Sequence, residues 1–280
     1  MDRSAAILLN LALAHMLAAA GPDPAPWDAL LKKYVDTRSR VDYAALARQD
    51  REALDAFLRD VAAPWPAAMD SAARKAALIN AYNALTVRWI VTHYPVASIQ
   101  KTPNPFKAER HTVDGRTVSL DQIESELRAM GDPRVHSVLV CAARSCPPLR
   151  REAYTAGNLE AQLDDNTRAW LADPQLNELN PDRNLASVSP IFQWYRDDFD
   201  PDPGLHAFLA RYAPGDQGNF EIEFKEYDWG LNNTSPLGSD YSKWELYADA
   251  AMHQPAGRWM LAAFGLIAGG GLWWLLRRRG

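Results

Sequence analysis

The stretch RVHSVLVCAARSCPPL, Arg134 to Leu149, holds both cysteines of the chain, Cys141 and Cys146, together with His136. Its apolar run, residues 135–140, predicts a buried strand. Two prolines follow Cys146, and proline favours the first turn of a helix, so Cys146 is expected at a helix N-terminus. A thiolate in that position has a lowered pKa. The stretch therefore suits either a nucleophilic cysteine or a small disulfide loop joining the two cysteines.

A long helix precedes this stretch. Asp70 and Ser71 suit its N-cap, and the pattern runs to Tyr94, where Pro95 ends it. Its apolar residues lie on nearly every face, which predicts a buried helix. Three polar residues interrupt its middle, namely Asn80, Tyr82 and Asn83. They are candidates for binding a ligand, and the alternative is a satisfied internal hydrogen-bond network.

The remaining pattern alternates between helices and short strands. Helices are expected over residues 27–35, 44–61, 120–130, 158–172, 189–199 and 205–212. Asp114-Gly115 predicts the turn of a β-hairpin over residues 111–119, and further strands are expected over 185–188 and 220–224. This order predicts an α+β fold, a mostly helical domain packed on a small, largely antiparallel sheet.

Both ends of the chain carry apolar segments. Residues 1–20 resemble a secretory signal peptide with an A-x-A cleavage pattern, the alternative being an uncleaved anchor, and residues 21–26 form a proline-rich linker. Residues 234–257 are expected to be a tether, and residues 258–280 a transmembrane anchor with an arginine-rich, cytoplasmic end. The apolar span covers about 27 Å, enough for a bilayer core. A processed sorting tail is the alternative for this end. The protein is therefore expected to be exported, periplasmic or extracytoplasmic, and anchored to the inner membrane.

Composition limits the kinds of partner. The net charge is −5 and the basic residues are scattered, which excludes a nucleic-acid-binding protein. Two cysteines and one nearby histidine lack the spacing of a zinc site, so no metal and no cofactor are expected. Ten tryptophans and ten tyrosines provide material for a core and for a binding groove.

Five motifs resemble, in the same order, those of the domain of unknown function 547 (DUF547) family. They are LINAYNALT (78–86), SLDQIE (119–124), DPRVHSVLVCAARSCPPL (132–149), FQWYRDDF (192–199) and EYDWGLN (226–232). The resemblance covers residues 27–233 and implies a fold and a pocket. It leaves the reaction open, because the family is largely uncharacterised. A histidine often follows the IE pair in the family, and Ser125 stands there in this chain.

Two functions compete at this point. In a thiol hydrolase or acyltransferase acting on peptide or cell-wall amides, Cys146 would be the nucleophile and His136 the base, with Asp228 or Asn83 orienting it. In a binding module for a peptide, glycan or protein partner, a Cys141–Cys146 disulfide would be a clip beside the groove. The expected binding residues are Asn80, Tyr82, Asn83, Arg144, Ser145, Tyr227 and Trp229. The state of the cysteines separates the two, because a nucleophile must be a free thiol.

Overall fold

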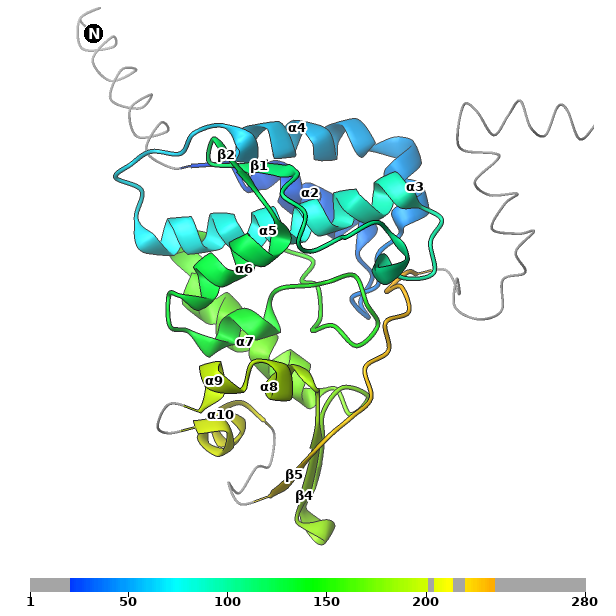
Figure 1. The fold of residues 1–280 in the computed structure, drawn as a ribbon, viewed down its shortest axis with the longest axis vertical. Coiled ribbons are helices and arrows are strands. Elements are labelled where there is room, and N and C mark those ends of the chain that lie inside the picture. Colours follow the sequence, from blue (N-terminus) through cyan, green and yellow to red (C-terminus); the bar gives the residue numbers. More distant parts are fainter. Residues whose placement is uncertain (1–20, 201–203, 214–219, 235–280) are drawn as a thin grey trace, which may run out of the picture.

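The computed structural model describes residues 21–200, 204–213 and 220–234. A layer of helices forms its N-terminal half: α2 (Ala25–Tyr34), α3 (Tyr43–Gln49) and α4 (Arg51–Ala62) pack around the long helix α5 (Ser71–His93) (Figure 1). The Asp70 side chain caps α5 by accepting a hydrogen bond from the backbone N–H of Ala73, as the sequence predicts. Helix α5 is buried on nearly all sides through its middle, which confirms the interpretation of its apolar pattern.

Helix boundaries differ from the prediction at two places. The proline-rich linker already enters α2, which begins at Ala25 with Pro26 in its first turn. The single helix expected over 44–61 is two helices, α3 and α4, separated at Asp50. The Asp50 carboxylate accepts hydrogen bonds from Lys33 Nζ at 2.7 Å and from the Tyr34 hydroxyl at 2.6 Å. These contacts tie the break between α3 and α4 to the end of α2.

The predicted hairpin is confirmed. Strands β1 (His111–Val113) and β2 (Arg116–Val118) pair antiparallel, and a 3₁₀ turn, η1 (Ile99–Lys101), lies upstream. Asp114 and Gly115 have φ angles of 52° and 68°, the left-handed conformations that a type I′ turn needs at both positions. Helix α6 (Leu120–Arg128) follows directly.

The prediction of a strand over residues 135–140 is wrong. Pro133–Ser137 is a 3₁₀ helix, η2, and the chain after it is irregular and buried. Its backbone is paired by a side chain instead of a strand: Val140 N–H donates to Asn83 Oδ1, and Asn83 Nδ2 donates to the Val138 carbonyl, both at 2.9 Å. A buried apolar run has the same pattern in either state, so the periodicity cannot distinguish them.

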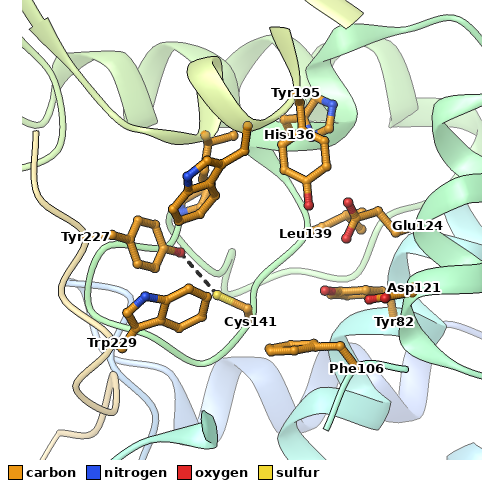
Figure 2. A pocket seen from close by; sticks show the side chains of 13 residues that line it. Tyr82, Phe106, Asp121, Glu124, His136, Leu139, Cys141, Tyr195, Tyr227 and Trp229 are labelled. Carbon is orange, nitrogen blue, oxygen red and sulfur yellow. Dashed lines mark hydrogen bonds between the residues drawn. The ribbon is translucent and has the colours of Figure 1, made fainter. Parts of the chain in front are cut away.

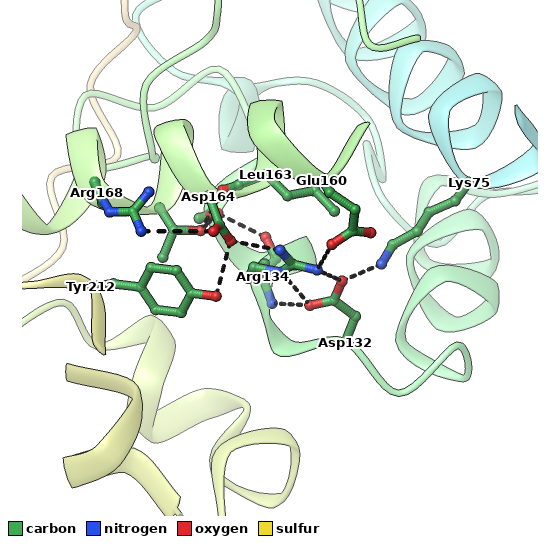
Figure 3. A network of polar contacts seen from close by, with 10 residues as sticks. Lys75, Asp132, Arg134, Glu160, Leu163, Asp164, Arg168 and Tyr212 are labelled. Atoms are coloured by element: carbon green, nitrogen blue, oxygen red, sulfur yellow. Dashed lines mark hydrogen bonds and ion pairs between the residues drawn. The ribbon is translucent and has the colours of Figure 1, made fainter. Parts of the chain in front are cut away.

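A charged network fixes η2 in position (Figure 3). The Arg134 guanidinium donates to Asp132, to Glu160 Oε2 at 2.6 Å and to Asp164 Oδ1 at 2.6 Å, and Lys75 pairs with Asp132. These basic partners hold the pKa of Asp132 at about 2, against the burial that would raise it. The network joins α5, η2 and the helix α7 (Leu159–Ala172) around one guanidinium.

No helix starts at Cys146, which corrects the second expectation for this stretch. Residues 147–155 are irregular, and the next elements are η3 (Ala156–Asn158) and α7. Pro147 and Pro148 explain the difference, because a residue before proline avoids the helical conformation. The first of two adjacent prolines therefore cannot simply begin a helix.

Short elements form the C-terminal part. Strands β3 (Glu178–Asn180), β4 (Leu185–Val188) and β5 (Glu221–Phe224) make a sheet in that order, with β3–β4 antiparallel and β4–β5 parallel. The helix expected over 189–199 is two, α8 (Ile191–Trp194) and α9 (Arg196–Phe199), and α10 (Gly204–Tyr212) follows; η4 is Pro181–Arg183. The α+β class with small sheets is confirmed, and the described strands form one antiparallel pair and one mixed sheet of three.

The buried side chains form two hydrophobic clusters. The larger one contains α2 to α6 and the cysteine stretch, and the smaller one surrounds Trp170, Phe192 and Leu209. Tyr227 packs against both. The predicted signal peptide and transmembrane anchor lie outside the described residues. Within the described ranges, none of the helices combines the length and apolarity needed to cross a bilayer.

Candidate functional site

A cavity of about 240 Å³ has walls from both clusters (Figure 2). Six of its lining side chains are aromatic rings and two are carboxylates. Among the residues that the structure describes, no lysine or arginine lines it. The lining side chains are Tyr82, Phe106, Asp121, Glu124, His136, Leu139, Cys141, Pro147, Ile191, Trp194, Tyr195, Tyr227 and Trp229.

Helix α6 places its two carboxylates in the cavity by helical spacing. Asp121 and Glu124 are three residues apart and so share one face of the helix. Burial raises the pKa of Glu124, the Tyr195 hydroxyl and Arg128 oppose that shift, and the nearby charge of Asp121 adds to it. A capping box holds the start of α6: Ser119 Oγ accepts from Gln122 N–H, and Gln122 Oε1 accepts from Ser119 N–H.

His136 is held by the carboxylate of Asp198, and not by Asp228 or Asn83 as expected. Its Nε2 lies 2.6 Å from Asp198 Oδ2, and Asp198 also pairs with Arg128 Nε at 2.5 Å. The imidazole stacks on Tyr195 with ring centroids 4.2 Å apart. His136 is 4% exposed, and this burial lowers its pKa to about 4, although Asp198 favours the charged form.

These contacts define the tautomer of His136. Its partners hold the pKa of Asp198 below its usual range, so Asp198 is an anion that only accepts hydrogen bonds. The neutral imidazole must therefore carry its proton on Nε2 and donate it to Asp198. Nδ1 is left with a lone pair and, within the described residues, has no hydrogen-bond partner. The imidazole, which is one of the side chains that line the cavity, thus keeps one ring nitrogen as a hydrogen-bond acceptor.

The two cysteines form a disulfide with Cα atoms 6.3 Å apart. Cys141 belongs to the cavity wall, and its Sγ lies 3.1 Å from the Tyr227 hydroxyl. Cys146 is buried and lines a separate groove beside Arg144. Ala142 has a φ of 62°, a left-handed conformation that turns the chain sharply between the cysteines. The thiol expected to be the nucleophile is thus not the one that faces the cavity.

The segment after β5 completes the wall. It pairs with the cysteine loop: Arg144 N–H donates to the Gly230 carbonyl at 2.8 Å, and Asp228 N–H donates to Ser145 Oγ at 2.9 Å. A Cβ at Gly230 would lie 2.8 Å from Asp228 Oδ1 and 3.0 Å from the Arg144 guanidinium, so a side chain here would displace the Arg144–Asp228 pair. Tyr227 and Trp229, on either side of Asp228, therefore reach the cavity.

The structure divides the predicted site residues into two groups. Tyr82, His136, Tyr227 and Trp229 line the cavity together (Figure 2). Asp228 does not orient His136: its side chain is 53% exposed and pairs with Arg144, and Asp198 is the partner of His136. Arg144, Ser145 and Asp228 together fasten the C-terminal segment to the cysteine loop.

Asn80 and Asn83 correct a second expectation. Asn80 Nδ2 donates to the Tyr154 carbonyl at 2.8 Å and its Oδ1 accepts from Tyr154 N–H at 2.9 Å, while Asn83 bonds Val138 and Val140. Both amides are buried and fully used by the backbone, so the internal network is the arrangement that the structure has. Neither asparagine orients His136 or lines the cavity.

Several cavity residues were not among the predicted site. Trp194 lines the cavity and is 48% exposed, and Asp198, which lies behind the wall, is bound to His136 and Arg128. The spacing of Asp121 and Glu124 was a usable signal, because it places both carboxylates on one helix face. The described residues contain no group of three or more His, Cys, Asp or Glu side chains arranged to hold a metal ion.

Fold and site together define an α+β domain with an acidic, aromatic cavity. A family model described as "Protein of unknown function, DUF547" matches residues 66–171, and this stretch of the chain is a DUF547 domain. The match is shorter than the 27–233 expected. It includes Tyr82, Asp121, Glu124, His136 and Cys141, and ends before the part of the wall that follows α7. No curated protein and no solved structure matches this chain.

Proposed function

We propose that this protein is a binding module that takes a small ligand, or one side chain of a partner, into the aromatic cavity. The supporting observation is the exposed Trp194, which stacks on Trp229 with ring centroids 6.0 Å apart and planes inclined by 16°. Both rings line the cavity. Concave, largely apolar sites with a few convergent polar groups are the usual form of ligand sites, and large exposed aromatic surface has a hydration cost.

The cell envelope is the proposed location. Residues 1–20 have the composition of an export signal, and residues 258–280 combine an uncharged span with terminal arginines. With this orientation the cavity would face the extracytoplasmic side. A peptide, a glycan fragment or a partner protein is the kind of ligand available there.

A thiol-dependent hydrolase is the second candidate. One observation favours it, because Cys141 and a base oriented by a carboxylate, His136, line the same cavity. An external thiol would first have to reduce the disulfide. The Cys141 thiol would then give its proton to the base and attack an amide carbon, the amine would leave with a proton, and water would hydrolyse the thioester. In Figure 2 His136 lies beside Tyr195, whereas Cys141 lies beside Tyr227 and Trp229, so the base and the sulfur have different neighbours and we favour binding.

Tryptophan fluorescence on the full chain in detergent micelles tests the binding module. Three probes are titrated: a neutral disaccharide, an uncharged dipeptide amide and an alkyl diamine. Binding of at least one probe should change the emission, and Trp194→Ala should weaken that binding at least tenfold. Phe224→Ala is the matched control, because Phe224 is an aromatic side chain, 40% exposed, that does not line the cavity. If none of the probes binds, the proposal fails.

Alkylation with and without reductant separates the two candidates. A binding module with a clip should show both cysteines blocked until reduction. Cys146→Ser, which removes the disulfide at the cysteine that does not line the cavity, should leave probe binding within about twofold. Fast alkylation of Cys141 without reductant would favour the hydrolase instead.

A further inference from the structure

We propose that the aromatic cavity binds an organic cation that carries N–H groups, such as an alkylammonium. This inference rests on the proposed binding function and names the chemistry of its ligand. The ammonium group could belong to a free diamine or to a lysine side chain of a peptide. The argument has three steps, which concern charge, hydrogen-bond polarity and the aromatic walls.

The charge of the cavity is negative. Asp121 and Glu124 are its lining carboxylates, and Asp198 lies directly behind His136. The nearest base, Arg128, is already bound to both oxygens of Asp198 and lies over the Tyr195 ring, 4.9 Å from its centroid. The guanidinium is therefore engaged by Asp198, and among the described residues no ion pair is formed by Asp121 or Glu124. Glu124 accepts a hydrogen bond from the Tyr195 hydroxyl and interacts with the charge of Arg128 only through space. A cationic ligand would supply that ion pair.

The charged side chains of the wall, Asp121 and Glu124, only accept hydrogen bonds, whereas its tyrosine hydroxyls and tryptophan N–H groups can donate. His136 is more than nine-tenths buried, donates through Nε2 to Asp198, and has its Nδ1 lone pair free of any partner in the described part of the chain. A ligand that matches His136, Asp121 and Glu124 must bring donors, which an ammonium with three N–H groups does and a quaternary ammonium does not.

The aromatic walls favour a positive charge as well. Tyr82, Phe106, Tyr195, Tyr227 and the Trp194–Trp229 pair surround the cavity. A ring face attracts a cation within about 6 Å of its centroid, most strongly for tryptophan. The volume of about 240 Å³ suits an alkyl chain with an ammonium end, and it excludes a folded macromolecule.

Calorimetric titration of the full chain in micelles tests this inference. The probes are 1,5-diaminopentane, a blocked lysine amide carrying the same ammonium, and 1,5-pentanediol as the uncharged analogue. The diamine or the lysine amide should bind at least tenfold more tightly than the diol, and whichever binds better identifies the source of the ammonium. Equal binding of the diol would overturn the inference.

Charge-removing variants locate the site. Glu124→Gln and Asp121→Asn should each weaken diamine binding about tenfold, whereas Glu226→Gln, an exposed residue outside the cavity, should change it less than twofold. Circular dichroism checks that each variant is folded. If Glu124→Gln does not fold, the binding measured for Asp121→Asn tests the site. If both cavity variants bind the diamine as tightly as the unaltered protein, the assignment is overturned.

The outcomes for the two proposals differ. If the disaccharide or the dipeptide amide binds in a Trp194-dependent manner while the diamine does not, the proposal of a cationic ligand is wrong and the proposal of a binding module is supported. If no probe binds, both fail.

Discussion

The Asn83 side chain makes the backbone hydrogen bonds that a neighbouring strand would otherwise make. Its amide bonds the backbone of Val138 and Val140, so it holds the irregular segment before Cys141 against helix α5. A buried residue with this role cannot lose its amide cheaply, because two backbone groups would be left without partners.

Asn83→Ala should therefore lower the free energy of unfolding by about 2–3 kcal/mol. Urea denaturation measures the change. Asn158→Ala is the matched control, since Asn158 is exposed and its side chain makes no capping hydrogen bond, and it should cost less than about 0.5 kcal/mol. Similar losses for the two variants would contradict the role assigned to Asn83.

His136 should make stability depend on pH. Its pKa is lowered from 6.5 to about 4 in the folded protein. Between these values the unfolded chain binds a proton that the folded protein does not, so stability falls as the pH falls. The contribution of His136 should decrease by about 2 kcal/mol between about pH 7 and about pH 5.

Variants separate His136 from the other groups. His111 is also buried with a pKa lowered to about 4, so it adds to the same slope. His136→Gln should remove about half of the combined slope in urea denaturation, whereas His206→Gln, on the exposed face of α10, should leave it unchanged. An unaltered slope in His136→Gln would show that this imidazole is not buried in the neutral form.

At the residue level, the residues that belong to a site could be predicted better than the residues to which they are hydrogen-bonded. Tyr82, Tyr227, Trp229 and His136 were expected at a site and line the cavity. The partner of His136 could not be predicted, because Asp198 is 62 residues away in sequence and only the tertiary fold joins them. The partners of the Asn80 and Asn83 side chains in α5 could not be predicted either, because they too are distant in sequence.

Helix α6 carries both cavity carboxylates, so its N-terminal cap supports the site. Ser119→Ala removes half of the capping box and should cost about 1 kcal/mol. It should also weaken diamine binding modestly, because fraying of the first turn displaces Asp121. Ser125→Ala makes the same chemical change at an exposed position of this helix and should do neither. A Ser119 variant as stable as the Ser125 variant would contradict the importance of the cap.

Elements with local signals were predicted well. The Asp114-Gly115 turn, the Asp70 cap and strand β4 follow from chemistry within a few residues. The cysteine stretch lacks such a signal, because Val and Leu pack equally well in a strand or in irregular buried chain. Its conformation depends on Asn83 and on the network around Arg134, which lie elsewhere in the sequence.

On the scale of the whole molecule, residues 227–234 join the two clusters. Leu231 N–H donates to the Ala97 carbonyl at 2.9 Å and Asn232 N–H to the Ala142 carbonyl at 3.0 Å, and the Tyr43 hydroxyl donates to Asn232 Oδ1 at 2.7 Å. These contacts connect the end of the described chain to its beginning. The segment is therefore part of the global fold even though it lacks helix and strand.

Hydrogen exchange should reflect this. The amides of Leu231 and Asn232 should exchange only through global unfolding, at the same free energy as amides in the middle of α5. Exposed amides of β5 should exchange faster. Exchange of Leu231 and Asn232 at a clearly lower free energy than α5 would show that the C-terminal segment opens on its own.

The direction of these bonds has a mechanical consequence. Thr234 N–H donates to the Val41 carbonyl, and the bonds of Asn232, Leu231 and then Arg144 follow one after another toward Tyr227. A pull on the chain at Thr234 would reach the bond of Thr234 before the bonds nearer Tyr227. Leu231 belongs to the larger cluster, and Tyr227 and Trp229 pack against that cluster, so a pull strong enough to extract Leu231 would also displace two side chains of the cavity wall. Under tension along the C-terminal end, the cavity and the larger cluster would therefore lose their shape together.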